Sequence, residues 1–169
     1  MLGTVHSLQI CESHRSPMKK VEEVVLITDV GIEGDIHASS EIRPSPVPDD
    51  PVSTYRRKER QVLLMDLETL QKFNLEIGLI KENITTTGLD INKLKQGQKI
   101  IVGDSATLTV TGPCTPCYRM DEIRSGLMDD IEGERGTLAF VEIGGTIRTG
   151  DNIRTVSYTH LTLPTNREV

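Results

Sequence analysis

The stretch that decides the fold class is residues 106–117, ATLTVTGPCTPC in one-letter code. Apolar residues alternate with threonine over its first six positions, and a Gly-Pro pair ends the pattern. Period-two alternation that stops at such a pair predicts a half-buried strand followed by a turn. The turn places Cys114 and Cys117 between this strand and the segment of helical spacing that follows it.

Strand-like segments of similar length recur through the rest of the chain, and glycine or aspartate separates most of them. They are residues 4–10, 21–30, 61–65, 84–87, 99–102, 137–143 and 146–148. Gly144-Gly145 is expected to form a two-residue hairpin turn between the last two. Short strands joined by turns favour a barrel or a sandwich, so the sequence predicts a mainly β fold.

Two segments have helical spacing instead. Asp66 is expected to begin a short helix that Asn74 ends. The second segment is predicted to be one continuous helix whose N-terminus lies beside Cys117. Its apolar stripe consists of Met120, Ile123, Leu127 and Ile131.

Composition limits the class of function. The chain has 169 residues, 36% hydrophobic residues, 3% aromatic residues and a net charge of −6. This length fits one domain with one core, and the few aromatics and the negative charge argue against binding to nucleic acid. No apolar run approaches the roughly 18 residues that a membrane span needs, and no signal-peptide core follows Met1. We therefore expect a cytoplasmic location.

Two segments are expected to lie outside the sheet. Residues 38–57 contain four prolines, which predicts a mobile surface loop that could close over a pocket as a lid. Residues 157–169 continue no pattern of the strands and are interpreted as a non-native or disordered tail. The predicted domain is therefore residues 1–156.

The two cysteines of the 106–117 stretch allow several chemistries. A cysteine at a helix N-terminus can be a reactive thiolate, whereas both cysteines could equally be small buried side chains. A zinc site would need two further ligands from Cys11 and the histidines. A thioredoxin-like redox pair and a cysteine nucleophile with His37 as its base are the other interpretations.

Polar groups elsewhere also suggest a site. Asp35 and His37 would point to the same side of an extended backbone and could line one pocket wall. Glu82-Asn83-Ile84-Thr85 offers acceptors and an amide at the start of a strand. The guanidinium groups of Arg60 and Arg135 suit a phosphate or a carboxylate.

Taken in order, these pieces resemble a stand-alone MOSC domain, the module also found at the C-terminus of molybdenum cofactor sulfurases. The resemblance runs from Gly3 to Val156. The motifs that carry it are Gly31-Ile32-Glu33-Gly34-Asp35-Ile36-His37, Arg60-Gln61-Val62, Glu82-Asn83-Ile84-Thr85-Thr86, Pro113-Cys114-Thr115-Pro116-Cys117, Arg135-Gly136 and Gly144-Gly145.

The resemblance implies a MOSC-type β-barrel with a few short peripheral helices and a pocket for the molybdenum cofactor. It implies that Cys117 is the catalytic residue, which binds molybdenum or carries sulfur, and that Cys114 is its less certain neighbour. The other expected cofactor-binding residues are Asp35, His37, Arg60, Glu82, Asn83, Thr85 and Arg135.

The resemblance further implies an oxidoreductase that reduces small N-hydroxylated compounds and receives electrons from a separate donor protein. The alternative is a non-catalytic carrier of the cofactor, or of sulfur as a persulfide, that delivers to a molybdoenzyme or receives from a sulfurase partner. The sulfurase's pyridoxal-phosphate domain is absent from this sequence. A small β-barrel binding module without metal is the third possibility.

Overall fold

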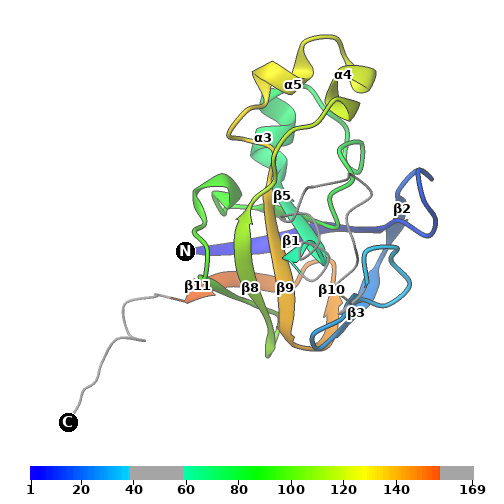
Figure 1. Ribbon diagram of the computed structural model, residues 1–169. Coiled ribbons are helices and arrows are strands. Elements are labelled where there is room, and N and C mark those ends of the chain that lie inside the picture. Colours follow the sequence, from blue (N-terminus) through cyan, green and yellow to red (C-terminus); the bar gives the residue numbers. More distant parts are fainter. Residues whose placement is uncertain (39–58, 157–169) are drawn as a thin grey trace, which may run out of the picture.

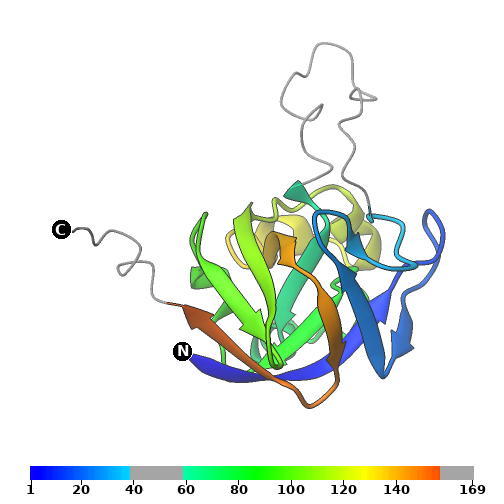
Figure 2. The ribbon, with the colours of Figure 1, turned by 90° about the horizontal axis from the view of Figure 1, so that it is seen from below.

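Seven strands close into a barrel in the computed structural model, which describes residues 1–38 and 59–156 (Figure 1). Their order around the barrel is β11-β7-β8-β9-β5-β6-β1, and the pairing of β1 with β11 closes it. Figure 2 shows these two strands side by side near the N-terminus. The barrel strands are β1 (Leu2–Ile10), β5 (Val62–Asp66), β6 (Ile84–Thr87), β7 (Lys99–Val102), β8 (Ala106–Pro113), β9 (Thr137–Ile143) and β11 (Asn152–Val156).

Most neighbours in the barrel are antiparallel, but β5 and β6 run parallel. Parallel neighbours need a crossover connection, and helix α3 (Leu67–Lys72) lies in the segment between these two strands. Parallel pairing also brings the starts of β5 and β6 to the same end of the barrel. The Glu82-Asn83 pair therefore lies beside the first residues of β5.

A small second sheet and one short strand complete the β structure. The second sheet has the order β10-β3-β4, and β2 pairs with the end of β1. The predicted strand over residues 21–30 is confirmed only at residues 23–27, because the chain bends at Glu22 and turns at residues 28–30. The observed strands are β2 (Lys19–Val21), β3 (Glu23–Ile27), β4 (Gly31–Ile32) and β10 (Gly145–Arg148).

The predicted hairpin at Gly144-Gly145 is also wrong. Strand β9 pairs with β8 and β5, whereas β10 leaves the barrel and pairs with β3. A side chain at Gly144 would place its Cβ 2.4 Å from the carbonyl oxygen of Leu26. Glycine is therefore needed here because two backbones approach closely, not because of a hairpin.

The barrel interior is filled by aliphatic side chains from every strand, among them Val5, Leu64, Ile100, Leu108 and Val141. A smaller cluster lies under the helices and contains Met65, Leu70, Met120, Leu127 and Ile131. Helices α3, α4 and α5 gather at one end of the barrel (Figure 1). They form a cap with its own apolar contacts.

The helix expected from Asp66 is confirmed as α3. Asp66 caps its N-terminus by accepting from the amide of Thr69. The predicted continuous helix after Cys117 is instead two short ones, α4 (Arg119–Ile123) and α5 (Leu127–Asp130). Gly126 between them has a φ of +88°, which interrupts helical geometry although the apolar stripe continues.

Two expectations fall outside the described structure. The predicted tail at residues 157–169, and the predicted loop from residue 39 onward, lie in the segments that the structure does not describe. Among the described residues, no helix is long and apolar enough to cross a membrane.

Candidate functional site

The loop after β4 and the start of β6 meet at a buried pair, Asp35 and Asn83. The Asn83 side-chain amide donates to Asp35 Oδ1 at 3.2 Å and to the Gln9 carbonyl oxygen at 3.2 Å. Its Oδ1 accepts from the amide of Leu63 at 3.0 Å. Asn83 therefore joins three segments of the chain, and every polar atom of its side chain has a partner.

Both side-chain oxygens of Asp35 also have hydrogen-bond partners. Its Oδ1 also accepts from the Cys11 amide at 2.7 Å, and its Oδ2 accepts from the His37 amide at 3.0 Å. The His37 imidazole Nδ1 lies 3.3 Å from the same Oδ2. Burial acts to raise the pKa of Asp35, but the hydrogen bonds from His37 and Cys11 outweigh burial and hold the pKa below its ordinary 3.8.

Asp35 and His37 are in contact, but the backbone between them is not extended as expected. Residues 35–37 form a turn rather than an extended strand. The turn folds the imidazole back onto the carboxylate, and the His37 side chain remains half-exposed. His37 therefore lies at the surface end of a chain of contacts that leads through Asp35 to Asn83.

Glu82, next to Asn83 in sequence, has a different environment. Its Oε2 accepts from the Gly78 amide at 3.0 Å and from the Thr85 hydroxyl at 3.2 Å. Its Oε1 is buried and has no hydrogen-bond partner in the described part of the chain. Burial raises the pKa of Glu82 above its ordinary 4.5.

Arg135 is the charged neighbour of Glu82, and its charge acts to lower the pKa of that carboxyl. The Arg135 residue is only 7% exposed, yet its Nε and Nη1 donate to no group among the described residues. Most buried polar groups in folded proteins have a partner, and a charged donor without one is costly. These two nitrogens are therefore suited to an acceptor that the protein itself does not provide.

The backbone next to Arg135 connects this arginine to the cysteine motif. The Gly136 carbonyl oxygen accepts from the Cys114 amide at 2.9 Å. Gly136 has a φ of +104°, and a Cβ there would lie 2.6 Å from the Leu64 carbonyl oxygen. The Arg135-Gly136 pair is thus fixed against β5 by a close backbone approach that only glycine permits.

The two cysteines of the motif differ in exposure. Cys114 is buried and Cys117 is exposed. Met120, in the first turn of α4, donates its amide to the Cys117 carbonyl oxygen at 2.9 Å. The Cys117 thiol is therefore accessible at the entrance to α4, whereas the Cys114 thiol is not.

The contacts bring seven of the nine predicted residues into one connected region. These seven are Asp35, His37, Glu82, Asn83, Thr85, Cys114 and Arg135. Cys117 lies three residues beyond Cys114. Arg60 lies half-buried two residues before β5, and among the described residues no hydrogen bond joins it to this region.

Sequence reasoning missed two members of this region, Ser7 and Gln9. Gln9 is buried on β1, and its Nε2 donates to the Thr85 hydroxyl and to the Glu82 carbonyl oxygen, both at 3.1 Å. The Ser7 hydroxyl donates to Gln9 Oε1. Their alternation with apolar residues could have indicated buried polar positions on a barrel strand, but the spacing alone names no partner.

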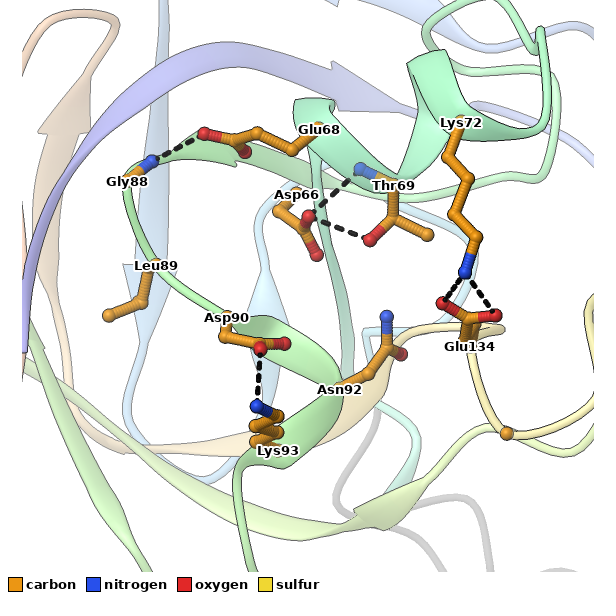
Figure 3. A pocket seen from close by; sticks show the side chains of 11 residues that line it. Asp66, Glu68, Thr69, Lys72, Gly88, Leu89, Asp90, Asn92, Lys93 and Glu134 are labelled. Carbon is orange, nitrogen blue, oxygen red and sulfur yellow. Dashed lines mark hydrogen bonds and ion pairs between the residues drawn. The ribbon is translucent and has the colours of Figure 1, made fainter.

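A hollow among the described residues lies elsewhere (Figure 3). Its volume is about 590 Å³, and its walls come from α3, the segment after β6, and residues 133–134. None of the nine predicted site residues lines it. Within residues 1–38 and 59–156, moreover, no cluster of three histidine, cysteine or carboxylate side chains could hold a metal ion.

Comparison with known proteins identifies the fold and the family. The YuaD protein of Bacillus subtilis has a crystal structure with a TM-score of 0.76 and 22% identity, and the match covers 94% of this chain and 97% of that one. YiiM from Escherichia coli matches with a TM-score of 0.64 and 20% identity over 93% of this chain and 70% of its own. YiiM from Geobacillus stearothermophilus matches with a TM-score of 0.66 and 16% identity, over 92% of this chain and 75% of its own.

One curated sequence relative carries a functional name. It is the "putative metal-sulfur cluster biosynthesis" protein YuaD of Bacillus subtilis strain 168, 27% identical over 118 residues. The match covers 59% of this chain and 62% of that relative, which is less than two thirds of the relative's length. The sequence profile of the MOSC domain matches residues 33–154, most of the chain, and the chain therefore belongs to the MOSC domain family.

Proposed function

We propose that this protein binds the molybdenum cofactor, of the molybdopterin type, and reduces N-hydroxylated compounds with Cys117 as the protein's ligand to molybdenum. The observation that carries the proposal is the difference in exposure within the cysteine motif, since only Cys117 presents an accessible thiol. Membership of the MOSC family supports the choice of cofactor.

The residues of the site suit this group. A soft thiolate is a fitting ligand for a metal whose other ligands include sulfur. Arg135 offers two buried donors without an acceptor, which suits an anionic oxygen such as that of a phosphate. A metal that is held mainly by its organic cofactor needs one protein thiolate and no preformed cluster of protein ligands.

The reaction would break an N–O bond. The hydroxylamine R–NH–OH takes up two electrons and two protons and yields the amine R–NH₂ and water. When bound, the cofactor would supply the redox chemistry, and a separate donor protein would supply the electrons. Among the protein's own groups, the Glu82 carboxyl has a raised pKa, which suits it to holding a proton near Arg135.

The test uses the full chain, purified from a host that makes the cofactor. We expect it to contain molybdenum and to reduce hydroxylamine when an artificial reductant such as reduced methyl viologen is supplied. Cys117→Ala should abolish reduction, whereas Cys114→Ala should retain it in the fraction that folds. Metal-free protein, or unchanged activity in Cys117→Ala, would contradict the proposal.

One observation favours a second function. The relative in Bacillus subtilis is named for metal-sulfur cluster biosynthesis, and an exposed thiol such as Cys117 is accessible to another protein. The chain would then carry cofactor or a persulfide for delivery to a molybdoenzyme, or accept sulfur from a sulfurase. Mass spectrometry separates the two functions. A carrier should show one added sulfur atom on Cys117 and no turnover of hydroxylamine.

A further inference from the structure

We propose that the hollow shown in Figure 3 binds a small organic cation that carries a primary ammonium group. The hollow has about 590 Å³, which is within the range of small-ligand pockets. The proposal does not depend on the proposed function, because none of the nine candidate site residues lines the hollow.

The first argument is the charge of the walls. Four carboxylates line the hollow, from Asp66, Glu68, Asp90 and Glu134, against the ammonium groups of Lys72 and Lys93. Both lysines are engaged: Lys72 lies 2.7 Å from Glu134 Oε1, and Lys93 lies 3.4 Å from Asp90 Oδ2. Two negative charges remain without a cation, so the hollow favours a positively charged ligand.

The second argument is an unpartnered atom. Asp66 is only 4% exposed, and its Oδ2 accepts from the amide and the hydroxyl of Thr69 at 2.9 and 2.7 Å. Its Oδ1 is buried and has no hydrogen-bond partner among the residues that the structure describes. Figure 3 shows this oxygen turned toward the hollow between Asp90 and Asn92. A buried charged acceptor without a donor is a costly arrangement that a ligand's N–H group would relieve.

The third argument concerns the kind of cation. The four carboxylates come from three segments, because Asp66 and Glu68 both lie at the start of α3, and each already has a donor of its own. No three of the described carboxylates gather as ligands of one metal ion. An ammonium group carries three donors that can reach one carboxylate and nearby amide or hydroxyl oxygens. The walls therefore fit an amine better than a divalent cation.

The experiment titrates the full chain with butane-1,4-diamine and follows the backbone amides by ¹H–¹⁵N NMR. We expect saturable shifts at Thr69 and Gly88, whose amides donate to Asp66 and Glu68. The uncharged butane-1,4-diol should cause none. A separate titration with Mg²⁺ alone tests whether the hollow binds a metal ion instead.

Two variants test the assignment. Asp66→Asn keeps an oxygen for the helix cap but removes the charge, and we expect it to weaken diamine binding at least about ten-fold, because a hydrogen bond to a charged group is lost. Asp90→Asn, at an exposed position, should weaken it about two- to five-fold, because it removes one exposed charge. Asp104→Asn, exposed in the turn between β7 and β8, is the matched control and should bind like the wild type.

Three results would overturn the proposal: no amide shifts with the diamine, equal shifts with the diol, or saturable shifts with Mg²⁺ and none with the diamine. If Asp66→Asn fails to fold, Asp90→Asn decides the outcome, and wild-type affinity in that variant would also overturn the proposal.

Discussion

Glu82 and Asn83 are neighbours in sequence, yet they belong to two regions of opposite character. Around Asn83 and Asp35, every side-chain polar atom of both residues has a partner within the protein. Around Glu82 and Arg135, three buried polar atoms have no partner in residues 1–38 and 59–156. The first region is complete without a ligand, and the second is not.

This difference in hydrogen bonding separates residues that position the site from residues that contact a ligand, which the sequence motifs did not distinguish. A fully bonded buried pair specifies how the loop after β4, the start of β5 and the start of β6 fit together. Unpartnered donors on a buried arginine suit a group that comes from outside the protein. We infer that Asp35 and Asn83 position the site, whereas Arg135 and Cys117 contact the ligand.

Replacing Asn83 should have the largest effect, and it tests whether the region around Asn83 and Asp35 has a structural role. Asn83→Ala removes the acceptor of the Leu63 amide, the donor to the Gln9 carbonyl oxygen and one of the two donors to Asp35 Oδ1, so we expect the free energy of unfolding to fall by about 3 kcal/mol. Urea denaturation measures it. Asn152→Ala, at an exposed position of β11, is the control and should change stability by less than about 0.5 kcal/mol. Equal losses in both variants would refute the structural role.

The pH dependence of stability should have opposite signs at the two carboxylates. The pKa of Asp35 is lowered on folding, so its contribution is present above pH 3.8 and lost as the pH falls further. Asp35→Asn should therefore be destabilised by about 2 kcal/mol at pH 7, and this deficit should shrink in acid.

The pKa of Glu82 is raised on folding, so its contribution is present below pH 4.5 and lost as the pH rises through the folded value. Glu82→Gln should equal the wild type in acid and gain stability relative to it as the pH rises. Denaturant curves of both variants between pH 3 and pH 8 provide the measurement. Parallel pH profiles would show that the two environments do not differ as described.

The cysteines provide a smaller effect. Cys114→Ser places a hydroxyl in a buried apolar position and should cost about 1 kcal/mol, whereas Cys117→Ser should change stability by less than about 0.5 kcal/mol. Alkylation by iodoacetamide, followed by mass spectrometry, should modify Cys117 well before Cys114 and Cys11. Modification of Cys114 at the same rate would contradict the buried assignment.

The sequence predicted local elements better than their partners. Strands at Lys99–Val102 and Thr137–Ile143 are confirmed, because alternation and turn residues are encoded within the strand itself. The hairpin at Gly144-Gly145 was wrong because pairing with β3 depends on contacts distant in sequence. The prediction of one helix after Cys117 was wrong because the apolar spacing continues across Gly126. The backbone leaves helical geometry at that glycine, and the spacing does not reveal this.

The site was predictable as a set of residues but not as two regions. Motifs quoted from the sequence placed Glu82, Asn83 and Arg135 together, yet which atoms are bonded depends on burial and on segments such as Gly78 and Gln9. The hollow beside α3 was not predicted at all. Its carboxylates form no motif in the sequence, and Asp66 and Glu68 come near Asp90 only when the parallel β5–β6 pair forms.

The most direct test of the account is the molybdenum content of Arg135→Met, measured beside the wild type after expression in a host that makes the cofactor. Methionine fills similar space without the unpartnered charge. It also leaves the buried Glu82 carboxyl without its cationic neighbour, so the molybdenum content is expressed per folded chain. The account predicts about one molybdenum per chain in the wild type and a loss of most of it in Arg135→Met. Full molybdenum content in Arg135→Met, or no molybdenum in the wild type, would contradict the account.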